Sequence, residues 1–142
     1  MTLIATEAKP LSNYVKHEYP FNNLTREQVT VSVTAADVLK VGASLGKITA
    51  TGKYIVAVET AVDGSKAFGG ILADLQDGSR ERTFATTGDV ILTIVNSGPA
   101  LASRNALEEL LDASYNDVTK RDTYFAGMVA AGIREATNLE AF

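Results

Sequence analysis

Residues 45–58 read Leu45-Gly-Lys-Ile-Thr-Ala-Thr-Gly-Lys-Tyr-Ile-Val-Ala-Val58, and this stretch decides the class of fold. Two apolar segments, 45–49 and 53–58, flank Ala50-Thr-Gly52, where the glycine permits a turn with positive φ. Short apolar runs on either side of a glycine turn are typical of a β-hairpin.

Further strands are expected on both sides of this hairpin. Val29, Val31 and Val33 alternate with polar residues, which is the period of a half-buried strand. Two Asp-Gly-Ser turns, 63–65 and 77–79, bracket the apolar run 67–75, and the nearly continuous run 90–95 predicts a fully buried strand. Strands at this spacing, over residues 28–95, predict a compact barrel or sandwich.

After Pro99 the apolar residues recur at the spacing of a helix and no longer at that of a strand. One helix is expected to bury a face made of Leu107, Leu110, Leu111 and Tyr115. A second helix is expected to begin at Thr119, which has capping-box spacing to Asp122, and to end at Gly132. Its buried face would carry Phe125, Met128 and Val129, and Ile133 would follow the glycine. The predicted class is therefore α+β, with a helical C-terminal third over residues 101–133.

The first 25 residues carry apolar side chains without a sustained period. These are Leu3, Ile4, Leu11, Tyr14, Val15, Tyr19 and Phe21. A solvated linker would not need so many of them. Two interpretations remain: a loop that packs over its own domain, or an extended N-terminal arm, residues 1–25, that orders against another molecule beside a domain of residues 26–142.

The composition excludes several classes of functional site and partner. The 142 residues include no cysteine, which excludes a disulfide framework, a thiolate metal site and a cysteine nucleophile. The net charge of -4 gives no electrostatic reason to expect a nucleic-acid partner. We also expect no membrane partner, because no apolar run approaches the roughly 18 residues of a spanning helix, and no signal peptide is recognised.

The sequence contains few residues in patterns that suggest catalysis. His17 is the one histidine, and Phe21 stands where a zincin motif needs a second one. The segment 42–48 fails the phosphate-loop spacing and ends in Ile48 where a Ser or Thr would bind magnesium. We therefore predict a protein that is not an enzyme, with no catalytic residue, no metal and no cofactor. Two alternatives stay open. One is a small β-barrel adaptor or carrier-type binding domain. The other is a hydrolase that uses turn carboxylates, namely Glu59, Asp63, Asp74 and Asp77.

The segment from Val41 to Leu75 resembles the head decoration proteins of lambda-like tailed bacteriophages. The resemblance is carried by Gly42-Ala-Ser-Leu-Gly46-Lys-Ile-Thr-Ala-Thr-Gly52-Lys-Tyr54, then Asp63-Gly-Ser65, then Gly70-Ile-Leu-Ala73. Near the C-terminus, Ala126-Gly-Met-Val-Ala-Ala-Gly132-Ile133 is similar to the small-residue helix that ends in Gly-Ile in that family. A helical portion around residues 101–117 departs from the shortest family members.

The resemblance implies a fold of the decoration-protein type and a structural role on the virion. Such proteins bind the outer surface of the expanded head, usually as trimers at local threefold positions between capsomers, and stabilise it against the pressure of packaged DNA. The implied partners are the major capsid protein and other copies of the chain, in a homotrimer made in the host cytoplasm. In the family the N-terminal arm orders against the capsid. We accordingly expect capsid contacts from Leu3, Ile4, Leu11, Tyr14, Val15, Tyr19 and Phe21.

Overall fold

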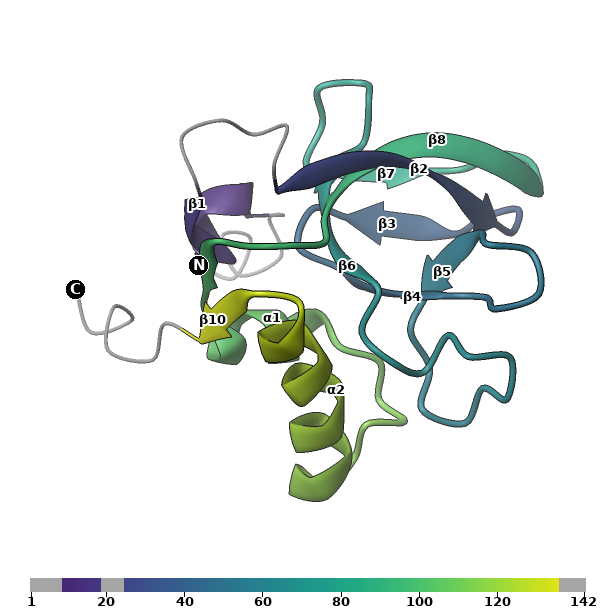
Figure 1. The fold of residues 1–142 in the computed structure, drawn as a ribbon. Coiled ribbons are helices and arrows are strands. Elements are labelled where there is room, and N and C mark those ends of the chain that lie inside the picture. The colour runs from purple at the N-terminus through teal and green to yellow at the C-terminus, as the bar shows by residue number, and fades with distance from the viewer. Residues whose placement is uncertain (1–8, 19–24, 136–142) are drawn as a thin grey trace, which may run out of the picture.

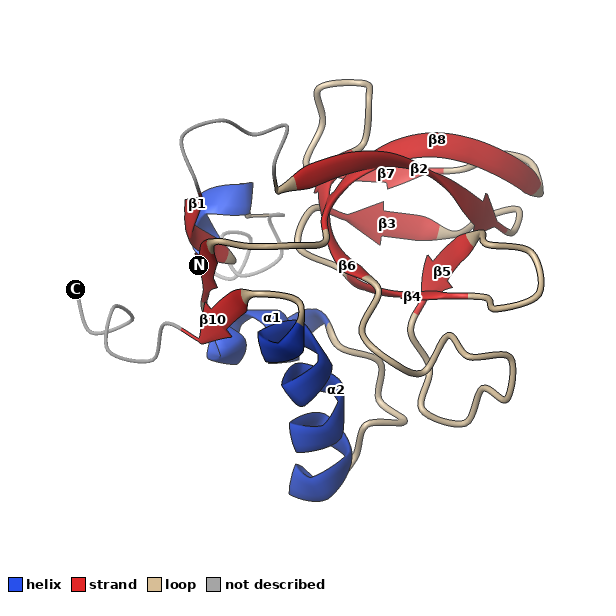
Figure 2. Cartoon of the chain, in the orientation of Figure 1, coloured by secondary structure: helices blue, strands red, loops and turns tan. Residues whose placement is uncertain are grey.

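The computed structural model describes residues 9–18 and 25–135, which form a closed β-barrel with a smaller helical layer at its side (Figure 1). The strands of these ranges are β1 Val15–Glu18, β2 Arg26–Val33, β3 Val38–Lys40, β4 Ser44–Lys47, β5 Tyr54–Val56, β6 Gly70–Asp74, β7 Glu81–Thr83, β8 Gly88–Val95, β9 Ala100–Ala102 and β10 Ile133–Glu135. The helices are a short 3₁₀ turn, Leu11–Asn13, then α1, Arg104–Leu110, and α2, Val118–Ala130. The predicted α+β class is confirmed (Figure 2).

The barrel closes in the order β2-β5-β4-β6-β8. The hairpin expected from residues 45–58 is confirmed as the antiparallel pair of β4 and β5, with Leu45 opposite Val56. The alternation along β2 is confirmed too, because Val29, Val31 and Val33 all lie in the core. Closing the sheet on itself leaves no free edge along these strands, which removes a template for uncontrolled pairing.

Strand β8 corrects one expectation. It pairs with β2 over eight residues, from Val95 opposite Arg26 to Gly88 opposite Val33. Leu92 and Ile94 are buried, whereas Ile91 is 62% exposed. The strand is therefore half-buried and not fully buried, because one face of an antiparallel barrel strand points outward to solvent.

A second sheet, in the order β1-β9-β10, lies beside the helices and shares a core with them. Strand β9 pairs antiparallel with β1 and parallel with β10, so it joins segments from the two ends of the described chain. None of these three strands was expected. Each has only three or four residues, which is too short for a period of two to be recognised in the sequence.

The helices differ from expectation at their ends. Helix α1 stops at Leu110, so Tyr115 is buried from a loop and not from a helical face. Helix α2 begins one residue earlier than expected, because the Asp117 side chain caps it by accepting from the Lys120 backbone N–H. Asp117, and not Thr119, is therefore the N-cap.

The buried face of α2 is confirmed for Phe125 and Met128 and wrong for Val129, which is 46% exposed. The end of the helix is confirmed: Gly132 has a φ of +98° and Ile133 is fully buried.

Candidate functional site

The first candidate site is the N-terminal segment, and most of its described part belongs to the body of the protein. Tyr14 and Val15 are 3% and 7% exposed, within the core that the helices share with β9. The Tyr14 ring lies against Gly42, where an added Cβ would come within 2.4 Å of a ring carbon. The side chains of Tyr14 and Val15 therefore pack within their own domain, and their contact with the capsid stays a prediction.

The other predicted contact residues fall into two groups. Leu11 is partly buried and packs against both core clusters, so little of its side chain is left for a partner. Leu3, Ile4, Tyr19 and Phe21 lie outside the described residues. Within the predicted arm of residues 1–25, residues 11–18 contribute a 3₁₀ turn and strand β1 to the fold.

The described chain starts at the surface. The Lys9 Nζ lies 3.4 Å from the Glu109 carboxylate of α1, and the two side chains are 50% and 59% exposed. A shallow polar cavity of about 250 Å³ adjoins this pair and is lined by Lys9, Asn13, Lys16 and Glu109, among others. Burial, with a smaller effect of Glu109, raises the pKa of Tyr14. Lys9, the first described residue, therefore lies at the surface beside α1.

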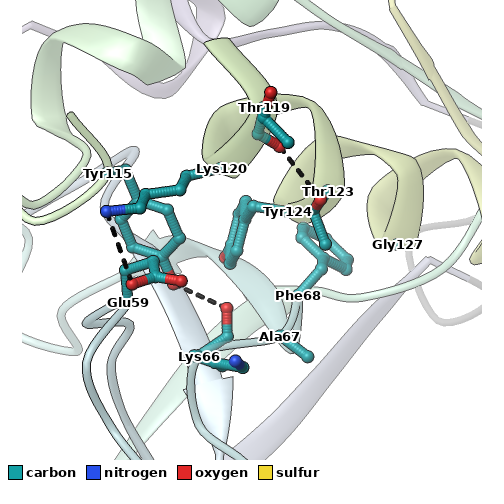
Figure 3. Close-up of a pocket in the computed structure, with 10 residues that line it drawn as sticks. All are labelled: Glu59, Lys66, Ala67, Phe68, Tyr115, Thr119, Lys120, Thr123, Tyr124 and Gly127. Atoms are coloured by element: carbon teal, nitrogen blue, oxygen red, sulfur yellow. Dashed lines mark hydrogen bonds and ion pairs between the residues drawn. The ribbon is translucent and has the colours of Figure 1, made fainter. Parts of the chain in front are cut away.

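A second candidate site is a cavity of about 300 Å³ between α2 and the 57–69 loop, which connects β5 to β6 (Figure 3). Its floor is aromatic. The Tyr124 ring makes edge-to-face contacts with Phe68 at 5.6 Å and with Tyr115 at 5.4 Å, measured between ring centroids. We call this cavity the aromatic pocket. Edge-to-face packing of this kind is favourable and fixes the relative orientation of the rings.

Hydrogen bonds fix the positions of the two tyrosines and of the 57–69 loop that line the pocket. The Tyr115 hydroxyl donates to the Lys66 carbonyl oxygen at 2.6 Å, and the Tyr124 hydroxyl donates to the Leu45 carbonyl oxygen at 2.8 Å. The Glu59 backbone N–H donates to the Ser114 hydroxyl at 2.8 Å. The 57–69 loop is therefore tied to the segment between α1 and α2, and α2 is tied to the barrel.

Burial sets the protonation of the two tyrosines. Desolvation, with smaller effects of Glu59 and Asp112, raises the pKa of Tyr115 to about 12. Desolvation also raises the pKa of Tyr124, whose ring is fully buried. Both hydroxyls are thus neutral donors at physiological pH, which suits a structural role in fixing the loop.

The rim of the pocket is charged. Lys120 of α2 pairs with Glu59 at 3.9 Å, and Lys66 lines the pocket from the 57–69 loop (Figure 3). Thr119 and Thr123 line the helical wall. This pocket was not expected from the sequence, because its two walls are separated by some fifty residues along the chain. A cue was present in Phe68, Tyr115 and Tyr124, three of the ten aromatic residues, but aromatic side chains mark a core as often as a cavity.

Three of the turn carboxylates, Asp63, Asp74 and Asp77, accept hydrogen bonds within their own turns. Asp63 Oδ1 accepts from the Ser65 hydroxyl at 2.6 Å, and Asp77 Oδ1 accepts from the Ser79 hydroxyl. These hydrogen bonds lower the pKa of both aspartates. Asp74 accepts from the Gln76 backbone N–H at 2.8 Å. Within the described ranges, no three potential ligands among histidine and carboxylate side chains gather to hold a metal ion.

Comparison with known proteins identifies the family. The family model described as Bacteriophage lambda head decoration protein D matches residues 4–133, which is all but the first three and last nine residues. No curated protein matches the chain. Among the described residues, neither helix has the length and apolar character needed to cross a bilayer. Because the match covers nearly the whole chain, the protein belongs to the lambda head decoration protein D family and is a structural, non-enzymatic decoration protein of the phage capsid.

Proposed function

We propose that the protein binds the outer surface of the expanded phage head as a homotrimer at local threefold positions, where it bridges neighbouring capsomers. In this position it would stabilise the shell against the pressure of packaged DNA. Membership of the family supports the decoration role. The trimer and its threefold position rest on the resemblance described above.

We further propose that residues 1–8 form the fastening arm, with Leu3 and Ile4 as anchors. The observation that supports this is the surface position of Lys9, which pairs with Glu109 outside the core. The body itself is already closed, since Tyr14 and Val15 complete its core. Tyr19 and Phe21 stay predicted contacts from the segment between β1 and β2.

Energetics favour several arms acting together. Burying one large aliphatic side chain contributes about 1.5–3 kcal/mol. Fixing the backbone opposes binding by about 1–2 kcal/mol per residue, so one arm alone would bind weakly. Once the first arm of a trimer has docked, the other two dock intramolecularly, which raises the apparent affinity by about 10²–10⁴. An arm that adds to a sheet edge of the shell would also gain backbone hydrogen bonds.

Co-sedimentation with expanded empty heads tests the proposal. We expect the protein to pellet with the shells and to saturate at three copies per local threefold position. Shells that carry the protein should also resist heat or chelation longer than bare shells. Saturation at a different number per site would contradict the trimer, and failure to pellet would contradict the attachment itself.

A further inference from the structure

One valine side chain is held fully exposed at the tip of a firmly tied loop. Val62 lies in the 57–69 loop and its side chain is completely accessible to solvent. The loop is fixed next to it: the Thr49 backbone N–H donates to the Asp63 carbonyl oxygen at 2.9 Å, and Ser65 is buried in the turn that Asp63 closes. A single exposed valine is ordinary on a protein surface. It gains significance because other residues of the same loop line the aromatic pocket.

The aromatic pocket is an apolar cavity that is open at the surface. Its volume of about 300 Å³ is ten times the roughly 30 Å³ that a water molecule occupies in the liquid. Phe68, Tyr115 and Tyr124 make its floor, and both tyrosine hydroxyls are already committed to backbone carbonyls. The floor therefore favours an apolar side chain over water as its occupant.

The charge beside the loop tip is opposite in sign to the net charge at the rim of the aromatic pocket. Asp63, next to Val62, is exposed, and its hydrogen bonds to Ser65 favour the ionised carboxylate. Lys66, Lys120 and Glu59 line the pocket, and Glu59 pairs with Lys120 at 3.9 Å. The rim therefore carries a net positive charge, which Lys66 supplies, and the tip presents an apolar side chain with an adjacent negative charge. Such an arrangement fixes the partner and its orientation.

We infer that the tip of the 57–69 loop, with Val62, inserts into the aromatic pocket of a second copy of the chain. The contact is heterologous, because the tip and the pocket are different surfaces of the same molecule, and repetition of such a contact generates a ring when the rotation closes. The inference rests on the trimer of the proposed function and names the surfaces that would build it. Ring closure after three copies leaves no unpaired tip or pocket.

Substitution of the tip gives the first test. We expect Val62→Asp and the milder Val62→Ser to shift the full-length protein from trimer toward monomer in sedimentation equilibrium, Val62→Asp more strongly. Circular dichroism and the melting curve should keep a folded β-rich domain, since the side chain touches no core residue. Ile91→Asp is the matched control, because Ile91 is a β-branched residue exposed on the outer face of β8. This control should stay trimeric.

Cross-linking gives the second test and benefits from a chain without cysteine. A Val62→Cys variant and a Thr123→Cys variant are co-expressed and treated with a short bismaleimide. The inference requires covalent dimers from the co-expressed mixture and none from either variant alone. Efficient cross-linking of Val62→Cys with itself would overturn it, since tips would then meet tips. A trimeric mixture without any cross-linked product would overturn it as well.

Different results would contradict the trimer and the contact between loop tip and pocket. If the wild-type protein sediments as a single chain at all concentrations, the trimer of the proposed function is wrong and this interface falls with it. If the wild type is a trimer and both Val62 variants remain trimers, only the interface is wrong. Binding of the wild-type protein to shells is measured separately and bears on the proposed function alone.

Discussion

The backbone N–H of Ser103 donates a 2.7 Å hydrogen bond to the carbonyl oxygen of Tyr14. The Ser103 hydroxyl in turn caps α1 by accepting from the Ala106 backbone N–H. One residue thus joins the N-terminal segment to the start of a helix nearly ninety residues away. For this reason residues 9–18 belong to the folded body, and the proposed arm is limited to residues 1–8.

Deletion of residues 1–18 is expected to destabilise the domain strongly, whereas deletion of residues 1–8 leaves its melting temperature nearly unchanged. The longer deletion removes β1 and the buried Tyr14 and Val15. Tyr14→Ala in the full chain isolates the aromatic contribution, and a loss of about 3–5 kcal/mol of unfolding free energy is expected for a buried ring. Urea unfolding measures all three. A fully stable 1–18 deletion would show that the segment is dispensable for folding.

Leu107→Ala is expected to cost about 2–5 kcal/mol of unfolding free energy, because Leu107 is fully buried between α1 and the β9 sheet. Val118→Ala at the start of α2 is the matched control, since Val118 is 62% exposed. Its effect should stay within about 0.5 kcal/mol. Equal effects of the two substitutions would contradict the assignment of α1 to the core.

Arg104→Met is expected to cost about 1.5–3 kcal/mol, a range typical of hydrogen bonds to charged groups. Arg104 binds the carboxylates of Glu108 and Asp122, lies 3.6 Å from that of Glu135, and stacks over Phe125. It therefore links α1, α2 and β10.

The control for Arg104 is Lys53→Met, which removes an ion pair with Asp89 whose side chains are each about 40% exposed. Exposed pairs contribute about 0–1 kcal/mol. Thermal unfolding should rank the Arg104 variant well below the Lys53 variant. The reverse order would mean that the Arg104 cluster does not stabilise the helical layer.

Tyr115→Phe is expected to change the dependence of stability on alkaline pH. The pKa of Tyr115 is raised from 10.0 to about 12 in the folded state, so the protonated hydroxyl favours folding. This contribution is fully present below pH 10 and is lost as the pH rises from 10 to about 12, because the unfolded chain ionises first. The variant should therefore lose stability less steeply over this range, and near neutral pH it should lose about 0.5–1.5 kcal/mol with the hydrogen bond to Lys66. Identical alkaline slopes for the two proteins would contradict the burial of this hydroxyl.

The barrel could be predicted from the sequence because its strands carry strong local patterns. Val29, Val31 and Val33 alternate cleanly, and the glycine turn at residue 52 sets the hairpin of β4 and β5. The end of α2 at Gly132 was equally clear. These features depend on neighbours in the sequence, so the chain itself carries the information.

The site was harder to predict because it depends on contacts between distant segments. Tyr14 and Val15 look the same in the sequence whether they pack on Gly42 and β9 or on another protein, and only the fold decides between the two. The aromatic pocket similarly needs Phe68 and Tyr124 to be brought together across α2 and the 57–69 loop. The fastening residues Leu3 and Ile4 stay predictions.

Binding of arm variants to expanded heads tests the central claim most directly. The measurement is the quantity of protein that pellets with shells as its concentration is raised, for the full chain, for the deletion of residues 1–8 and for Leu3→Asp combined with Ile4→Asp. The account predicts that both variants keep the wild-type melting temperature and oligomeric mass and lose at least 100-fold in apparent affinity. Wild-type binding by the deletion variant would contradict the claim that residues 1–8 fasten the protein to the shell.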